Sequence, residues 1–361
     1  MRIKRLIFIC VALILGFTTL FVVSCDNNNN NNNYTDDIIN QYFDPTLPDD
    51  GIMEFTCSIM NIESFERIIP LGQIRPSAHT FPTDHIYFVL KGSGHPIYAP
   101  CGGKIIYIAE DAVGDGIIRI GVTNSMTYYI SHIYLNKDLK EGDMVSAGNR
   151  IGTSMPIPCV DFGVLNKNID NGFLSQKHPI VTMYGDKPLS YYTEPLRSEL
   201  YALVKPPRPY GEPDYVYDRD KYNVTDGEFA LDKAGTLRGN WFQEGGFSAG
   251  GWYEWDITLS FGYDVFYPDK IVIGCGKYEY SFATKKEDNP VRPEDVSTSS
   301  GTVVYYLYDG FHTGKEGEPI RDRIGLMLVQ MLSDTRIKLE IFDDTTSESR
   351  EFTSAATYYT R

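Results

Sequence analysis

The stretch Tyr128–Ser154, with the sequence YYISHIYLNKDLKEGDMVSAGNRIGTS, decides the fold class of this chain. It begins with aromatic and β-branched residues, which suit a pleated, half-buried surface. The charged segment Lys140–Asp143 contains Gly142, and glycine adopts a positive φ at little cost, so this segment predicts a turn. One titratable ring, His132, lies in the first apolar run. The stretch therefore predicts short antiparallel strands around a single histidine.

Similar strand signals surround this stretch. They are short, rich in β-branched and aromatic residues, and bounded by glycines and acidic turns. The predicted strands are Phe55–Met60, Ile86–Leu90, Gly103–Ala109, Gly116–Val122, Tyr128–Tyr134, Met144–Val145, Arg150–Gly152 and Val160–Leu165. Only Glu194–Val204 places its leucines on one helical face. The pattern predicts an antiparallel β domain over residues 55–204.

A second β domain is predicted over residues 223–361. The proline-rich start of 205–222 cannot continue a helix or a central strand, so that segment is a stiff linker. The predicted strands are Gly227–Leu231, Leu237–Phe242, Trp252–Phe261, Lys270–Ile273, Tyr278–Phe282, Thr302–Tyr308, Arg323–Leu332 and Ile337–Phe342. Their spacing favours a β-sandwich or an up-and-down barrel, and the whole chain is predicted to be all-β. Gly239-Asn240-Trp241 resembles the G-x-W of lipocalin-like barrels.

The N-terminus indicates export. Basic residues precede an apolar run, Leu6–Val23, which is nearly long enough for a spanning helix. The run ends in Val22-Val23-Ser24-Cys25, which resembles the bacterial lipobox, and this ending favours a lipoprotein signal peptide over residues 1–25. The resemblance implies lipidation of Cys25 and anchoring to a membrane of the bacterial envelope. Residues 26–54 begin with an asparagine run that cannot bury apolar surface, so they are predicted to be a disordered tether.

Charge and cysteine content exclude some functions. The formal net charge is −15, whereas nucleic-acid binding needs a basic surface. Cys57, Cys101, Cys159 and Cys275 form no C-x-x-C pair, which argues against a thiolate zinc site. In an exported protein Cys57 and Cys101 could form a disulfide, and buried free thiols are the alternative.

Three motifs in one order resemble a known family. They are APCGGKII from Ala99, YISHI from Tyr129, and EGDMV from Glu141 followed by GNRIG from Gly148. Together they resemble the duplicated hybrid motif of lysostaphin-type (LytM-like) zinc endopeptidases, which cut peptide cross-links in bacterial cell walls. The resemblance covers roughly Arg75–Leu165 and implies the fold of that peptidase domain.

The resemblance also implies a site, which this chain departs from. The family binds zinc with an H-x3-D motif and with the second histidine of a later H-x-H. The first histidine of that pair and the histidine of Y-x-H act on the proton and the oxyanion. Here His79 and Asp84 are spaced one residue further apart, and His85 follows. Cys159 and Asp161 occupy the two late histidine positions, so only His132 matches cleanly.

Two hypotheses follow for the first domain. In one, a metal-dependent hydrolase binds zinc through His79, Asp84 or His85, and Asp161. His132 would then assist proton transfer, and Cys159 would act as a ligand or nucleophile. In the other, the groove binds cell-wall peptide, glycan or an envelope protein without catalysis. Losing both late histidines removes a ligand and a proton-handling group together, which favours the second hypothesis.

A third hypothesis assigns binding to the second domain of a structural envelope lipoprotein. Trp241, Trp252 and Trp255 are close in sequence and could form a face on which a sugar or another ligand stacks. The alternative is that they fill the core of the domain, which ordinary burial statistics favour.

Overall fold

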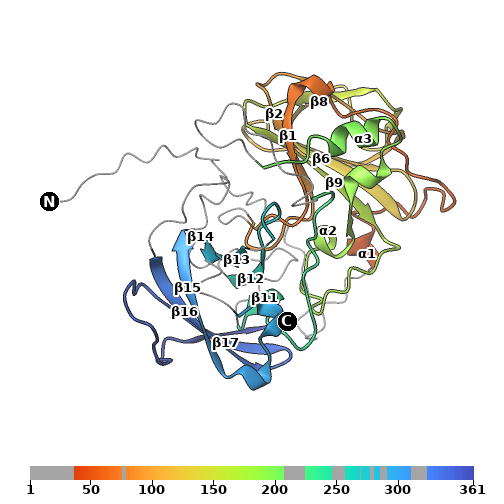
Figure 1. Ribbon diagram of the computed structural model, residues 1–361. Helices are drawn as coiled ribbons and strands as arrows, with labels where there is room; N and C mark the ends of the chain where they lie inside the picture. Colours follow the sequence, from red (N-terminus) through yellow and green to blue (C-terminus); the bar gives the residue numbers. More distant parts are fainter. Residues whose placement is uncertain are drawn as a thin grey trace. The chain divides into compact units, whose positions relative to one another are not determined.

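A computed structural model describes residues 36–74, 79–206, 224–245, 257–268, 270–276, 280–284, 291–309 and 323–361 (Figure 1). Most regular elements are strands, arranged in two antiparallel sheets. The all-β prediction is therefore confirmed. The helices are α1 (Asp36–Ile39), α2 (Ile180–Met183) and α3 (Leu196–Tyr201), with 3₁₀ turns η1 (Ile62–Ser64), η2 (Pro188–Tyr191), η5 (Pro293–Asp295) and η6 (Thr298–Ser300).

The first sheet has ten strands in the order β1-β2-β9-β6-β5-β4-β7, with β10 paired to β9 and β8 paired to β3 and β6. The strands are β1 (Phe65–Ile69), β2 (Ile86–Leu90), β3 (Pro96–Tyr98), β4 (Gly103–Glu110), β5 (Gly116–Gly121), β6 (Met126–Leu135), β7 (Met144–Val145), β8 (Arg150–Ser154), β9 (Cys159–Asn166) and β10 (Gly185–Asp186). The stretch Tyr128–Ser154 contains most of β6 and all of β7 and β8. Strand β6 lies between β5 and β9, and its far end also pairs with β8.

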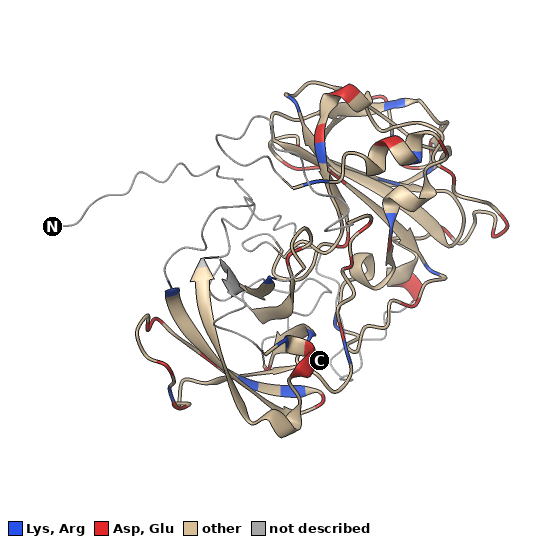
Figure 2. Ribbon diagram, in the orientation of Figure 1, with Lys and Arg blue, Asp and Glu red and all other residues tan. Residues whose placement is uncertain are grey.

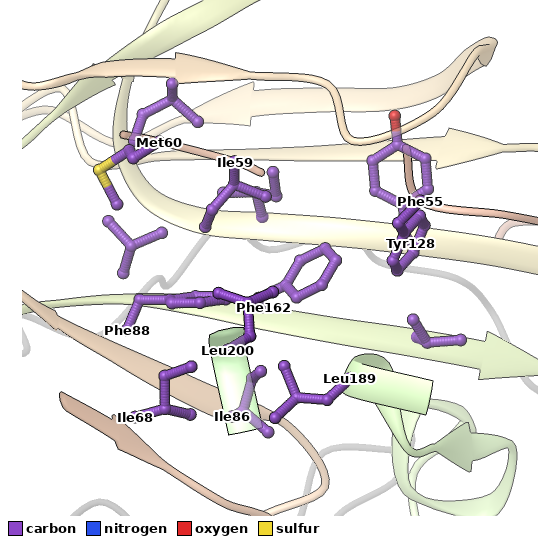
Figure 3. Close-up of a cluster of buried hydrophobic side chains, with 14 of the residues drawn as sticks. Phe55, Ile59, Met60, Ile68, Ile86, Phe88, Tyr128, Phe162, Leu189 and Leu200 are labelled. Atoms are coloured by element: carbon purple, nitrogen blue, oxygen red, sulfur yellow. The ribbon is translucent and has the colours of Figure 1, made fainter. Parts of the chain in front are cut away.

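One face of this sheet forms the main core (Figure 3). Alternate residues of β2, β6 and β9 point into it, among them Phe88, Tyr128 and Phe162, all fully buried. The turn η2 and helix α3 add Leu189 and Leu200 to the same core. Burying each such side chain contributes roughly 1.5–3 kcal/mol of transfer free energy. The opposite face of the same strands carries Tyr87 and Asp161.

Strand β6 changes its alternation at His132. Tyr128 and Ile130 point into the core, and so do Ile133 and Leu135, so the parity shifts by one between them. His132 has a φ of 65°, and it is the one non-glycine residue in the described ranges with a positive φ. The pairing of β5 with β6 is irregular at the same place, as in a β-bulge. Without the bulge, alternation would turn His132 toward the core; with it, the ring lies on the opposite face.

The second sheet is a barrel. It runs β11 (Gly239–Gln243), β12 (Thr258–Tyr263), β13 (Ile271–Cys275), β14 (Tyr280–Thr284), β15 (Thr302–Asp309), β16 (Arg323–Ser333), β17 (Arg336–Phe342) and β18 (Thr357–Thr360). Each strand pairs with the next, and β18 pairs with β11, so the sheet closes. Of the two alternatives predicted from sequence, the up-and-down barrel is the one found. Closure removes the exposed sheet edges that a sandwich would keep.

Trp241 is a core residue of the barrel. It is 0% exposed, and its Nε1 donates to the carbonyl of Leu237 at 2.9 Å. The guanidinium of Arg361 lies 4.1 Å from the centre of its ring and also donates to the carbonyls of Lys233, Thr236 and Arg238. This geometry gives Trp241 a structural role rather than an exposed stacking face. Trp252 and Trp255 lie outside the described residues.

The structure differs from the sequence prediction at several elements. Phe55 and Gly227 make only isolated bridges, to Tyr192 and Leu71, so Phe55–Met60 and Gly227–Leu231 are not strands. Strands β1, β3, β10 and β18 were not predicted. The β1 sequence FERII alternates poorly because Glu66 and Arg67 are adjacent. None of Cys57, Cys101, Cys159 and Cys275 forms a disulfide in the structure, so the suggested Cys57–Cys101 bridge is not present.

Charges are interspersed over both sheets (Figure 2). Within the described ranges, no helix combines the length and the apolar composition that crossing a membrane would require. Cys25, the signal segment, residues 26–35 of the predicted tether and most of the 205–222 linker lie outside those ranges. The rest of the predicted tether, residues 36–54, is described and contains the buried side chains of Phe43 and Met53, 1% and 2% exposed, so a disordered tether is not found there.

Candidate functional site

The predicted site residues come from three places in the first domain. His79, Asp84 and His85 lie in the loop that leads into β2, Asp161 lies on β9, and His132 lies at the bulge of β6. Strand register brings them together, because Asp161 is paired with Tyr87 of β2 on one side and with Ser131 of β6 on the other. Asp161 is thus the central residue of the group.

Five side chains form a continuous chain of alternating acids and imidazoles, which we call the Asp–His network. Asp84 Oδ1 lies 2.8 Å from His85 Nδ1, and His85 Nε2 lies 3.4 Å from Asp161 Oδ2. On the other side His132 Nε2 lies 3.2 Å from the same Oδ2, and His132 Nδ1 lies 2.8 Å from Asp115 Oδ2. Each imidazole therefore joins two carboxylates, and Asp161 is shared by both.

Two residues that sequence reasoning missed support the ends of this network. Thr182 of α2 donates its hydroxyl to Asp84 Oδ2 at 2.5 Å. Asp115, in the turn before β5, accepts a hydrogen bond from His132 Nδ1 at its carboxylate. The backbone amide of Asp115 donates to Asp111 Oδ1 at 2.9 Å. Neither residue belongs to a motif with metal-ligand spacing. Only the bulge at His132, which aims the ring at the turn, reveals the role of Asp115.

The network holds both imidazoles in their charged form. Burial alone would lower the pKa of His85, but the charge and hydrogen bond of Asp161, together with Asp84, raise it to about 10. The same competition at His132, with Asp161 and Asp115 as partners, raises its pKa to about 11. The His132 side chain is 38% exposed, so water screens part of this effect. At neutral pH both rings are imidazolium ions.

The pKa values of the buried carboxyl groups are lowered, whereas those of His85 and His132 are raised. Burial would raise the pKa of Asp161, but the charges of His132 and His85 outweigh it and hold the pKa well below its usual range. For Asp84, burial is likewise outweighed by the hydrogen bond and charge of His85 and by Thr182, so its pKa is lowered. Both groups are ionised at neutral pH, which makes these buried charges a set of ion pairs rather than isolated charges.

His79 lies beside the network as a neutral ring. Its centroid is 5.0 Å from that of His85 and 6.0 Å from that of Tyr87. Burial and the positive charge of His85 lower the pKa of His79 to about 3. His79 is therefore neutral at neutral pH while His85 is charged, because a proton on His79 would lie next to the His85 imidazolium ion.

The glycine at position 163 has a local explanation. A Cβ there would lie 2.2 Å from a ring carbon of Tyr129, which faces it on the adjacent strand. The Tyr129 ring therefore fills the space above Gly163, on the face of the sheet that also carries Asp161.

Cys159 lies two residues before Asp161 on the same face of β9, opposite Val89. Two residues of a strand span roughly 6.6 Å. Cys159 therefore shares its face of β9 with Asp161, one strand repeat away.

The residue types of the network suit a divalent metal. Among the residues that the structure describes, however, no group of three or more His, Cys, Asp or Glu side chains meets the geometry of a metal site. His85 Nε2 and Asp161 Oδ1 are buried and make no hydrogen bond of good geometry. The Nε2 atoms of His85 and His132 both lie close to one oxygen of Asp161, Oδ2, at 3.4 and 3.2 Å, as in two ion pairs that share a carboxylate.

Comparisons with known proteins give partial structural similarity. No family model matches the chain, and no curated protein matches it. Csd3 from Helicobacter pylori is 19% identical over 36% of this chain and 35% of that one, with a TM-score of 0.25. A zinc containing peptidase from Vibrio cholerae is 18% identical over 31% of this chain and 38% of that one, with a TM-score of 0.26.

The catalytic domain of the antimicrobial peptidase lysostaphin from Staphylococcus simulans is 16% identical over 37% of this chain and 97% of that one, with a TM-score of 0.28. This chain thus spans less than two fifths of the first two structures. Part of the chain is similar, at low sequence identity, to cell-wall peptidase domains of the lysostaphin type.

Proposed function

We propose that this chain is a cell-envelope protein whose peptidase-like groove binds cell-wall peptide without the family's metal-dependent hydrolysis. One observation carries the proposal: Asp161, at the position of the second late histidine, forms an ion pair through one oxygen with both His85 Nε2, at 3.4 Å, and His132 Nε2, at 3.2 Å. A general base or a metal ligand needs a free nitrogen lone pair. Two imidazolium ions paired with one carboxylate have none to offer at neutral pH.

The groove face next to the network suits an extended peptide. Tyr87 and Val89 of β2 and Cys159 of β9 lie on the same face as Asp161 and are partly exposed. A peptide lying along these strands would contact an apolar strip that ends at the charged network. His132 and Asp115 are the network residues that reach solvent most, with side chains 38% and 28% exposed. They would contact the polar end of the ligand.

Binding and turnover measured on the purified chain test this proposal. Soluble wall peptide should bind, and mass spectrometry should find it intact after prolonged incubation with micromolar zinc. The variant Asp115→Asn, which changes the solvent-facing end of the network, should weaken binding several-fold. The matched variant Asp138→Asn, at an exposed position of the β6–β7 loop, should leave binding unchanged. Cleaved peptide, or equal affinity in both variants, would overturn the proposal.

The geometry also keeps a second candidate, a metal-dependent hydrolase with a rearranged ligand set. The separations of 3.2 and 3.4 Å between Nε2 and Oδ2 atoms are close to the edge of a tetrahedral zinc site, about 3.3 Å. His85 and His132 have carboxylate partners on their Nδ1 atoms, as zinc-bound histidines do. Zinc would have to displace the protons of both rings. Stoichiometric zinc in the purified chain, lost in Asp161→Ala, would favour this candidate.

The lipid anchor belongs to the same proposal. The resemblance of Val22–Cys25 to a lipobox supports it, together with the polar segment that follows. Mass spectrometry of the chain isolated from membranes should find Cys25 at the N-terminus with its acyl chains. The variant Cys25→Ala should leave the membrane fraction. An unmodified Cys25 in membrane-isolated protein would contradict the anchor and leave the proposed binding site untouched.

A further inference from the structure

The loop that carries His79 is seated on the outer surface of the barrel. We call its described residues, Ile74 and His79–Asp84, the His79 loop. The hydroxyl of Ser260 on β12 donates to the carbonyl of Thr80 at 2.5 Å. The next residue, Phe81, packs its ring edge-on against Phe242 of β11 at 5.1 Å between centroids. Thr80 and Phe81 are both buried by these contacts.

The barrel offers small residues at the place where the loop approaches. Strand alternation turns Leu259, Phe261 and Ile273 into the barrel interior, and Ser260 and Gly274 outward. Ser260 and Gly274 are direct partners across β12 and β13. A Cβ on Gly274 would lie 2.1 Å from the carbonyl oxygen of Thr80, so only glycine admits the loop at this distance.

An apolar contact secures the other side of the loop. Ile74 forms a small buried cluster with Leu231 and with Val272, another outward-facing residue of β13. Atoms of Ile74 also lie where a Cβ on Gly262 or Gly274 would be, at 2.9 and 2.7 Å. The His79 loop is therefore held by a hydrogen bond, a ring contact and close apolar packing, all from the barrel.

The loop leads directly into the Asp–His network. Thr80 follows His79, whose ring lies 5.0 Å from that of His85, and the loop ends at Asp84, the first acid of the network. A displacement of the Thr80 carbonyl by an ångström would move His79 by a similar amount. Buried ion pairs lose most of their stabilisation when their geometry degrades.

We propose that the barrel completes the site of the first domain, with Ser260 and Gly274 as positioning residues for His79 and, through Asp84, for the Asp–His network. This assigns the second domain a role in building the groove, in place of a separate ligand site. It does not depend on the proposed peptide binding, because it concerns the geometry of the loop alone.

Two barrel variants and a matched control test this inference in the purified full chain. Gly274→Ala places a methyl group against the Thr80 carbonyl. Gly325→Ala makes an equivalent clash inside the barrel, 2.5 Å from the carbonyl oxygen of Phe342 on β17. Ser260→Ala removes only the hydrogen bond and keeps the packing. The readout is the set of histidine ring signals in ¹H–¹⁵N spectra, assigned with His79→Gln and His85→Gln.

Gly274→Ala and Ser260→Ala should shift the ring signals of His79 and His85, and Gly325→Ala should leave them in place. Amide exchange of Thr83, which donates to the carbonyl of Gln73 just before the loop, should quicken about fivefold in Ser260→Ala. Unchanged ring signals in both loop-facing variants, or the same shifts in Gly325→Ala, would overturn the inference. If Gly274→Ala does not fold, Ser260→Ala alone decides the outcome.

Discussion

Replacing Asp161 with asparagine should remove a large part of the stability of the first domain. The substitution keeps the shape of the side chain but removes the charge shared by His85 and His132. His85 is the better measure of the loss because its side chain is only 9% exposed. Its pKa of about 10 in the folded chain compares with an ordinary value of 6.5.

The magnitude follows from linkage between protonation and folding. A pKa raised from 6.5 to about 10 contributes roughly 4 kcal/mol at pH 7, at 1.36 kcal/mol for each pH unit. This contribution is fully present below pH 6.5 and is lost as the pH rises through 10. The lowered pKa of Asp161 describes the same interaction and is not added. Because Asp84 remains beside His85, we expect Asp161→Asn to lose about 3 kcal/mol.

The assay is urea unfolding at pH 6, 8 and 10, with Asp138→Asn as the control for an exposed aspartate. All three tryptophans fall within residues 223–361 of the sequence, so we expect their fluorescence to report on the second domain, while circular dichroism follows both sheets. The difference between Asp161→Asn and the unsubstituted chain should be largest at pH 6 and shrink toward pH 10. A difference that is constant across this range, or a His85 pKa near 6.5 by NMR titration, would refute the reasoning.

Three further predictions follow from the contacts above. Gly163→Ala should destabilise the first domain by about 1–3 kcal/mol because the added methyl group overlaps the Tyr129 ring. Adding Tyr129→Leu should restore part of this stability, and a double variant that is no more stable than Gly163→Ala would contradict the explanation. Arg361→Ala should lower the urea midpoint followed by tryptophan fluorescence, since it removes the ring contact with Trp241 and hydrogen bonds to four backbone carbonyls. An unchanged midpoint would argue against this role. Acid should unfold the first domain as its buried carboxylates take up protons. The stability that comes from the lowered pKa values of Asp161 and Asp84 is present above about pH 4 and is lost below it. Circular dichroism measured against pH would show this loss, and a flat profile down to pH 2 would exclude it.

Local sequence determined the elements of the fold with little help from tertiary structure. The short, apolar and β-branched runs in Ile86–Leu90, Gly103–Ala109 and Val160–Leu165 predict strands that the structure contains, because such side chains suit a pleated, buried sheet and turn residues bound the runs. The barrel strands follow from the same rule. Sequence failed where pairing is not periodic: Phe65–Ile69 becomes a strand through its partner β2, in spite of two adjacent charges.

Sequence also determined which residues gather at the site, but not their arrangement. The motifs single out His79, Asp84, His85, His132 and Asp161, and all of them lie in one region. Only tertiary structure decided that Asp161 is the acid between two imidazoles, because a bulge with positive φ at His132 turns the ring away from the core. The roles of Asp115, Thr182 and Ser260 were likewise decided in three dimensions. Their contacts join segments that are distant along the chain, and no local pattern encodes such contacts.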